Sequence, residues 1–320
     1  NSDGLSDTLE RNLISGNNGC GILHNIQSNP AALPNVIAGN YVGTDATGLT
    51  ALPNSGSGLA SATGPNYNVV IRNNVISGNG GGGIAIDGLN QAVIGGNFIG
   101  VGADGATPLG NTGGSGISLT GSDNQVGGVN PGEANIVANH SLGASYASGI
   151  DLASTAQRNS VRGNRIFNNQ NLGLDLNGDH IANPNDDGDG DAGANGLQNY
   201  PVIAFAQSFV NGTTVISGTL GSQASTTYTL DFYRSAVADD SGYGEGENYL
   251  GSDLVTTGAG GVVTFTITLP GVTVPGGEVV TATATDPDGS TSEFSAAFGP
   301  VSGVTDVPIS GLSAQAQLPI

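Results

Sequence analysis

An acidic stretch between Asp175 and Asp191 holds the densest group of potential ligands in the sequence. Its spacing matches the opening of a calcium-binding loop, in which alternate oxygen-bearing side chains converge on the ion and Gly190 permits the turn. No Glu stands where the closing bidentate ligand would be expected, so a solvated acidic linker is the alternative. We predict a Ca²⁺ site at the joint between two domains, with ligands from Asp179, Asn185, Asp187, Asp189 and Asp191.

Two aspartates, Asp151 and Asp175, follow the same short marker of Gly and an aliphatic residue. This spacing would place them on successive turns of one face, with Arg162 and Arg165 close to Asp151. Hydrolysis of a glycosidic bond needs paired carboxylates at a defined separation. Ladders of Asp and Arg along a surface are the alternative, and we predict no catalytic residue from this pattern.

The other residues with metal or nucleophile chemistry are isolated. His24, His140 and His180 show no metal-ligand spacing and are expected at surfaces or in turns. Cys20 has no partner for an internal disulfide and is expected to be a small buried hydrophobic residue. The acidic loop from Asp239 to Glu247 would hold a cation or, as we expect, remain solvated.

Composition limits the partners of the chain. All six basic residues are Arg, 26 residues are acidic, and the formal net charge is −20. Nucleic acids, anionic membranes and polyanionic polysaccharides need basic contacts, so they are excluded as expected partners. No apolar run is long enough to span a bilayer, and a chain that begins at Asn1 without any Met is typical of a processed, exported protein. We therefore expect an extracellular protein, and divalent cations, neutral glycans or a cell-surface partner remain as candidate partners.

Short repeats occupy the first half of the chain. Each is a brief apolar alternation closed by Asn or Gly, which is too short for an independent hairpin but suits one side of a solenoid coil. Asn tolerates left-handed backbone and bonds neighbouring backbone with its amide, so stacked Asn residues are expected to form ladders. We predict coils of roughly 20 to 35 residues that stack as a rod. The copies are Asn12–Asn17, Asn35–Gly43, Asn74–Asn79 and Val93–Gly100, with weaker copies at Asn135–Asn139 and Asn159–Ile166.

These repeats resemble those of right-handed parallel β-helix proteins of bacterial surfaces, a fold similar to the pectin-lyase-like superfamily. The resemblance is carried chiefly by Gly39–Asn54 and Gly96–Asn111, and it covers about residues 10 to 200. Many pectin-lyase-like proteins cleave or epimerise polysaccharides, so the resemblance implies either a scaffold or a polysaccharide-active lyase, hydrolase or epimerase. Lyases of this type commonly use Arg or Lys with Ca²⁺, and the chain has no Lys.

The sequence predicts an all-β chain of two domains and a tail. Residues 1–199 form the parallel β-helix with an acidic joint near 175–199, residues 200–299 form an immunoglobulin-like β-sandwich, and residues 300–320 form an extended apolar tail. Seven alternating segments bounded by Gly, Pro and Asp turns favour the sandwich. They are Val202–Ala206, Thr213–Leu220, Thr227–Tyr233, Tyr249–Val255, Val263–Leu269, Glu278–Thr285 and Ser292–Phe298.

The uncharged tail is a candidate for adding a strand to a partner, and a linker to a further module is the alternative. We predict head-to-tail self-association in which the tail, or the face of the sandwich, covers the first coil of the next subunit. The predicted interface residues are Val307, Ile309, Leu312, Leu318 and Ile320. The function favoured by the sequence is thus a structural or adhesive protein of a bacterial cell surface, built into a filament or appendage. A polysaccharide-active enzyme or glycan-binding module is the alternative.

Overall fold

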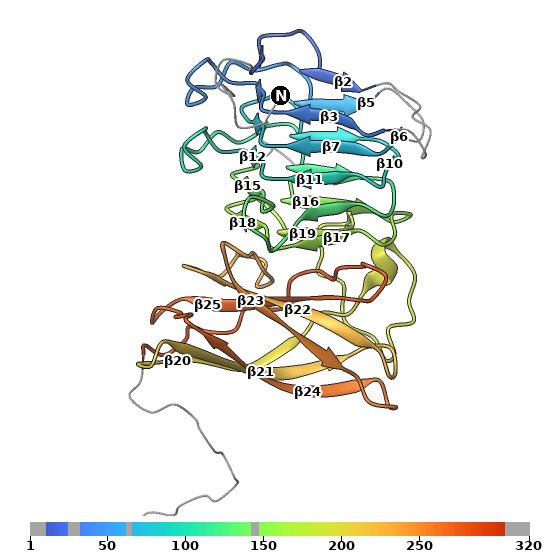
Figure 1. Ribbon diagram of the computed structural model, residues 1–320, viewed down its shortest axis with the longest axis vertical. Helices are drawn as coiled ribbons and strands as arrows, with labels where there is room; N and C mark the ends of the chain where they lie inside the picture. Colours follow the sequence, from blue (N-terminus) through green and yellow to red (C-terminus); the bar gives the residue numbers. More distant parts are fainter. Residues whose placement is uncertain (1–10, 25–32, 62–65, 142–146, 305–320) are drawn as a thin grey trace, which may run out of the picture.

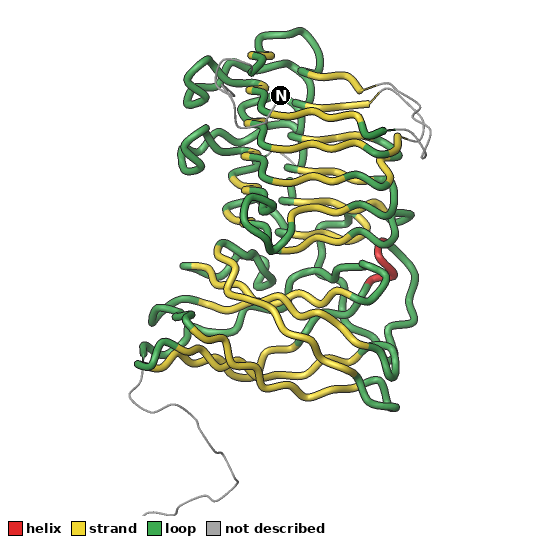
Figure 2. Tube along the Cα trace, viewed as in Figure 1, coloured by secondary structure: helices red, strands yellow, loops and turns green. Residues whose placement is uncertain are grey.

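A computed structural model describes residues 11–24, 33–61, 66–141 and 147–304. Its first part is a stack of short parallel strands, and its second part is a pair of antiparallel sheets set across one end of the stack (Figure 1). Coloured by secondary structure, the described residues are strand and loop apart from a short 3₁₀ helix, η1 (Ala194–Leu197), between the two parts (Figure 2). The predicted all-β class is confirmed for the described residues.

Three parallel sheets form the sides of the stack. The first contains β1 (Leu13–Ile14), β4 (Tyr41–Val42), β8 (Val75–Ile76), β12 (Phe98–Ile99), β15 (Ile136–Ala138) and β18 (Arg165–Phe167). The second contains β3 (Asn35–Ala38), β7 (Val69–Arg72), β11 (Val93–Gly95), β14 (Gln125–Gly127) and β17 (Ser160–Arg162). The third contains β2 (Ile22–His24), β5 (Leu59–Ser61), β9 (Ile84–Ile86), β13 (Ile117–Leu119), β16 (Ile150–Ala153) and β19 (Leu174–Asn177). A two-stranded ladder, β6 (Asn66–Tyr67) with β10 (Leu89–Asn90), lies beside them.

The interior of the stack is made by the alternation seen in the sequence. In the third sheet Ile84, Ile117 and Ile150 are paired in register and have no exposed surface. The residues that follow the last two, Ser118 and Asp151, point outward. The glycine before each strand is required by close packing, because a Cβ at Gly116 would lie 2.4 Å from Val137 Cγ1. The marker of Gly and an aliphatic residue therefore indicates a position where the backbone packs closely on its neighbours and the next side chain enters the core.

Asparagine ladders run along the corners, as the sequence predicts. In one ladder the side-chain amide of Asn97 donates to the Asn135 oxygen at 2.9 Å and to the Ile71 carbonyl at 2.8 Å. The backbone amide of Asn97 donates to the same Asn135 oxygen at 3.0 Å. Successive rungs are 23 residues apart at the shortest and 38 at the longest in this ladder, so only its longest coil exceeds the predicted length. The ladder contains Asn12, Asn40, Asn74, Asn97, Asn135 and Asn164.

The second part consists of two antiparallel sheets that share a core. One sheet contains β20 (Val202–Phe209), β21 (Thr213–Gly221) and β24 (Val262–Pro270), and the other contains β23 (Asn248–Thr256), β22 (Thr227–Ser235) and β25 (Val279–Thr285). Phe232 and Phe265 meet between the sheets, with ring centroids 6.1 Å apart. The sheets therefore form a β-sandwich, and its assignment to the immunoglobulin-like class stays a prediction.

The seventh predicted strand, 292–298, is wrong. This segment makes only isolated bridges, and the hydroxyls of Ser292 and Ser295 accept the amides of Ala284 and Ala282 that a strand would have bonded through its backbone. The amides of Ser292, Ser295 and Phe298 still donate to carbonyls of β25, so the segment runs irregularly along the edge of the sheet. Phe294 lies in the core of the β-helix, where it packs with Tyr233 at a centroid distance of 5.2 Å.

Candidate functional site

The outward face of the third sheet brings Asp151 and Asp175 together. The two residues are register partners on β16 and β19, the last two strands of that sheet. Their place on successive coils of one face, expected from the sequence, is confirmed. Asp175 has no exposed surface, whereas Asp151 is half-buried.

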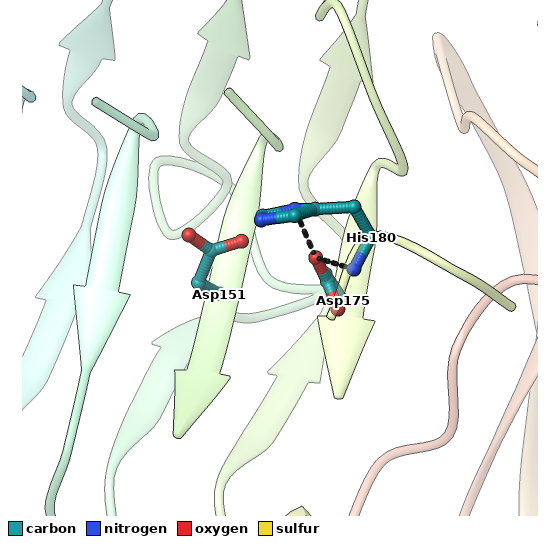
Figure 3. A group of neighbouring side chains, drawn as sticks. All are labelled: Asp151, Asp175 and His180. Carbon is teal, nitrogen blue, oxygen red and sulfur yellow. Dashed lines mark hydrogen bonds and ion pairs between the residues drawn. The ribbon is translucent and has the colours of Figure 1, made fainter. Parts of the chain in front are cut away.

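His180 completes this cluster from the turn that follows β19 (Figure 3). Its Nδ1 lies 2.8 Å from Asp175 Oδ2, and its backbone amide donates to the same oxygen at 3.1 Å. The imidazole ring extends from Asp175 toward Asp151, so it lies between the two carboxylates (Figure 3). Sequence analysis missed His180 because its only signal, a His five residues after Asp175, has no recognised metal spacing.

Two serines hold the carboxylates. Ser148 donates its hydroxyl to Asp175 Oδ2 at 3.0 Å, and Ser115 donates its hydroxyl to Asp151 Oδ2. The second oxygen of each carboxylate, Oδ1, is buried and has no hydrogen-bond partner. The serine hydroxyls therefore fix both carboxylates, and the Oδ1 atom of each can still accept a hydrogen bond or bind a cation.

Burial makes both carboxylates weaker acids than usual. Burial and the neighbouring Asp151 carboxylate raise the pKa of Asp175 to about 6. Burial likewise raises the pKa of Asp151, against the lowering effect of the Ser115 and Ser148 hydroxyls and of His180. Such a pair can hold a proton or bind a cation near neutral pH.

A second notable cluster lies at the C-terminal end of the stack, where residues of the sandwich accept backbone amides of the last coil. Glu245 accepts the side-chain amide of Asn169 at 2.7 Å and its backbone amide at 3.2 Å, as the next Asn of a ladder would. Glu293 accepts the Leu176 amide of β19 at 2.9 Å, and the Thr291 hydroxyl accepts the Val161 amide of β17 at 3.0 Å. Gly246 bonds Ile166 of β18 in both directions. All three parallel sheets are thus closed by the sandwich.

Comparison with known families agrees with this architecture. The family model described as a right-handed β-helix region matches residues 2–186. The chain belongs to this family. No curated protein matches this right-handed β-helix in sequence.

Among solved structures, this right-handed β-helix is similar to the full-length tailspike protein 2 of Escherichia coli O157:H7 bacteriophage CAB120. The identity is 14% and the TM-score 0.24, and the match covers 82% of this chain and 43% of the tailspike. With so low a score, no functional inference rests on the tailspike.

The arginines expected beside Asp151 lie elsewhere in the β-helix, so this expectation is wrong. Arg162, on the second sheet, makes two bonds to the buried Asp231 of the sandwich, at 2.6 and 2.8 Å. Arg165, on the first sheet, donates to the Glu247 carbonyl at 3.1 Å. A coil turns through three sheets, so residues near in sequence point in different directions.

The predicted calcium ligands are only partly gathered. Asp189 and Asp191 form a group with Asp186 in which one oxygen from each lies within 4.8 Å of the others. Asn185 instead pairs with the backbone of Tyr200, and Asp179 is exposed and accepts the Ile181 amide. Asp187 is exposed and outside the group. Calcium binding stays a prediction, which thermal melting in excess EDTA and in millimolar Ca²⁺ would test.

Other expectations change or lie outside the described residues. His24 and His140 are buried rather than at the surface, and Cys20 is only half-buried, between β1 and β2 of the first coil. His140 is buried because it occupies a ladder position, where its Nδ1 accepts the Asn111 amide at 3.4 Å. In the loop at Asp239 to Glu247, Glu245 is buried against the last coil instead of solvated.

The predicted interface residues from Val307 to Ile320 lie outside the described residues. No helix in the described ranges is long and apolar enough to cross a membrane.

Proposed function

We propose that the chain is a rigid structural or adhesive element of an extracellular bacterial surface and that its subunits associate end to end. The observation that carries this proposal is the difference between the two ends of the stack. At the C-terminal end, every sheet meets hydrogen-bonding groups of the sandwich. At the other end, β1, β2 and β3 each pair with one neighbour only among the described strands.

The first coil is also less well covered than those that follow it. Ile14, Ile22 and Ile37 are half-buried, while their register partners farther along the stack have almost no exposed surface. Unpaired edge strands beside accessible apolar side chains favour the addition of further strands. An association through unlike surfaces is head-to-tail, so it propagates unless it closes into a ring.

Only part of the sandwich is open to a neighbouring subunit, because the rest forms a cap on the last coil of its own chain. The sheet that contains β22, β23 and β25 already contacts the last coil of its own chain through Asp231, Tyr233 and the bridge to Ile166. The opposite sheet, with β20, β21 and β24, or residues 305–320 therefore remain as the surface that would cover the first coil of the next subunit.

A proline in the edge strand tests this proposal. The Asn35 and Gly39 amides bond toward β7, so the intervening Val36 amide points to the opposite edge. Val36→Pro should therefore remove an edge donor without removing a bond to β7. We expect the wild type to form long particles by light scattering and electron microscopy and Val36→Pro to remain monomeric. Wild-type protein that stays monomeric at high concentration would rule out end-to-end association.

A second variant separates the two partner surfaces. Removal of residues 307–320 should abolish polymers if the tail makes the joint. Fibres that persist in the truncated protein, but not in Val36→Pro, would assign the joint to the outer sheet of the sandwich.

A polysaccharide-active enzyme is a second candidate, favoured by the adjacent carboxylates of Asp151 and Asp175 beside His180. Its reaction would be acid–base cleavage of a glycan, with these groups exchanging protons with the glycosidic bond. Turnover of a neutral glycan, pectate or alginate that disappears in Asp151→Asn and persists in Asp123→Asn would establish it. Equal turnover by both variants, or none by the wild type, would reject it.

A further inference from the structure

The imidazole of His180 is held by Asp175 in a defined orientation. Asp175 Oδ2 accepts the His180 backbone amide at 3.1 Å and lies 2.8 Å from Nδ1, so both the residue and its ring are fixed. In the neutral imidazole this contact places the hydrogen on Nδ1 and leaves the lone pair on Nε2. Figure 3 shows the Nε2 end of the ring directed toward Asp151.

Asp151 presents an acceptor from the other side. Its Oδ2 accepts the Ser115 hydroxyl, and its Oδ1 is buried without a hydrogen-bond partner. Asp175, which is fully buried, also has an Oδ1 without a partner. A divalent cation bound between the imidazole and these carboxylates would offset the cost of holding their negative charges in a largely buried place.

The donor set selects the kind of cation. One ligand atom from each of Asp151, Asp175 and His180 lies within 4.8 Å of the others. Imidazole nitrogen with carboxylate oxygen suits Zn²⁺ and its first-row neighbours, whereas Ca²⁺ and Mg²⁺ prefer oxygen alone. A histidine that binds metal through one nitrogen usually donates the other to a carboxylate, which is the contact between His180 and Asp175.

We propose that Asp151 and His180 bind a divalent first-row transition ion, with Zn²⁺ as the reference, and that Asp175 holds the imidazole for it. Water would complete the coordination, because the His180 side chain is 20% exposed. The ion would join β16 and β19 to the turn that leads out of the last coil. The site requires neither end-to-end association nor activity on a glycan.

Zinc titration of the full chain by calorimetry at pH 7, without any polysaccharide, tests this site. We expect one equivalent of Zn²⁺ to bind the wild type. Asp151→Asn and His180→Gln should abolish this binding, and Asp175→Asn should weaken it ten- to a hundredfold. Co²⁺ should give a visible absorption band that is lost in the same variants.

Three control variants separate this site from the other metal-binding groups of the chain. Asp123→Asn, Cys20→Ser and Asp189→Asn should bind Zn²⁺ as the wild type does. Circular dichroism would show that Asp151→Asn, which keeps the size of the side chain, retains the fold. Absence of zinc uptake by the wild type at micromolar concentration would leave a proton between the groups and overturn the proposal. Unchanged uptake in Asp151→Asn and His180→Gln, or uptake lost in Asp189→Asn or Cys20→Ser, would also overturn it.

Discussion

The middle of the stack and its last coil satisfy the same backbone groups in different ways. In the middle, Asn97 receives bonds from Asn74 and donates to Asn135, so each coil supplies the partner of the one before. At the last coil Asn159 still donates to Asn195 of η1 at 2.9 Å, but the ladders that reach Asn164 and Asn169 have no further Asn among the described residues. Glu245, Glu293 and Thr291 of the sandwich accept the amides instead, and Tyr233 and Phe294 cover the apolar interior.

This difference shows what ending a repeat requires. A repeated coil needs only neutral side chains, because donor and acceptor capacity are balanced in every layer. The cap must place acceptors where no further coil exists, and two of them are buried carboxylates. The last coil is therefore the part of the stack whose stability should depend most on pH and on single side chains.

The largest expected effect is loss of the aromatic cover. Phe294→Ala removes a side chain that is 4% exposed and packs on Tyr233, which should cost about 3–5 kcal/mol. Amide hydrogens of β17, β18 and β19 should then exchange faster than those of earlier coils. Phe265→Ala, equally buried within the sandwich, is the control and should not expose the last coil selectively. Equal protection of the last coil in both variants would argue against a cap made by Phe294.

Glu245→Gln should change the pH dependence of stability. Burial raises the pKa of Glu245 to about 8 from 4.5, so the unfolded chain releases a proton that the folded chain keeps. Stability is therefore complete below about pH 4.5 and falls as pH rises through 8. Gln keeps the accepting oxygen, so the variant should be more stable by on the order of 3 kcal/mol at pH 9 and equal at pH 4.

Denaturant titrations across this pH range would measure the effect of Glu245→Gln. Glu247→Gln, two residues away and half-buried, is the matched control and should change little. If the free energy of unfolding of Glu245→Gln varied with pH in parallel with the wild type, ionisation of this carboxyl group would not control the stability of the last coil.

Loss of one ladder asparagine in the middle of the stack should lower the free energy of unfolding somewhat less than the changes at the last coil. Asn97→Ala removes donors to Ile71 and Asn135 and the acceptor of two Asn74 bonds, at 2.8 to 3.1 Å. Neighbouring buried groups lose their partners, and we expect a loss of about 2–3 kcal/mol without dependence on pH between 5 and 9. Asn130→Ala, whose side chain is exposed and contacts Glu133, should be nearly neutral in the same unfolding experiment.

The smallest effect at neutral pH is expected at the ladder position held by His140. Burial lowers the pKa of His140 to about 4 from 6.5, so stability is present above about pH 6.5 and is lost as pH falls through 4. His140→Asn should restore the usual rung and change stability by about 1 kcal/mol or less at pH 7. Its advantage should grow in acid, and an acid unfolding midpoint identical to that of the wild type would contradict this assignment.

The sequence determined the stack because its signals are local. Alternation within three residues decides which side chains point inward, and the marker glycines Gly83, Gly116 and Gly149 stand where a Cβ would collide with the backbone of the next coil. Recurrence of the marker also predicted that Asp151 and Asp175 share a face, because residues at equal positions in successive coils align.

Tertiary structure alone decided the cap and the histidine of the cluster. Leu176 and Glu293 are 117 residues apart, and Asn169 and Glu245 are 76 apart, so no periodic signal connects them. Segment 292–298 alternates as a strand does, but it bonds irregularly along β25 and places Glu293 and Phe294 against the last coil. His180 lies between two carboxylates only because the turn after β19 folds back over the outer face of the third sheet. These contacts depend on where the sandwich and the turn lie against the stack, which the repeat pattern does not encode.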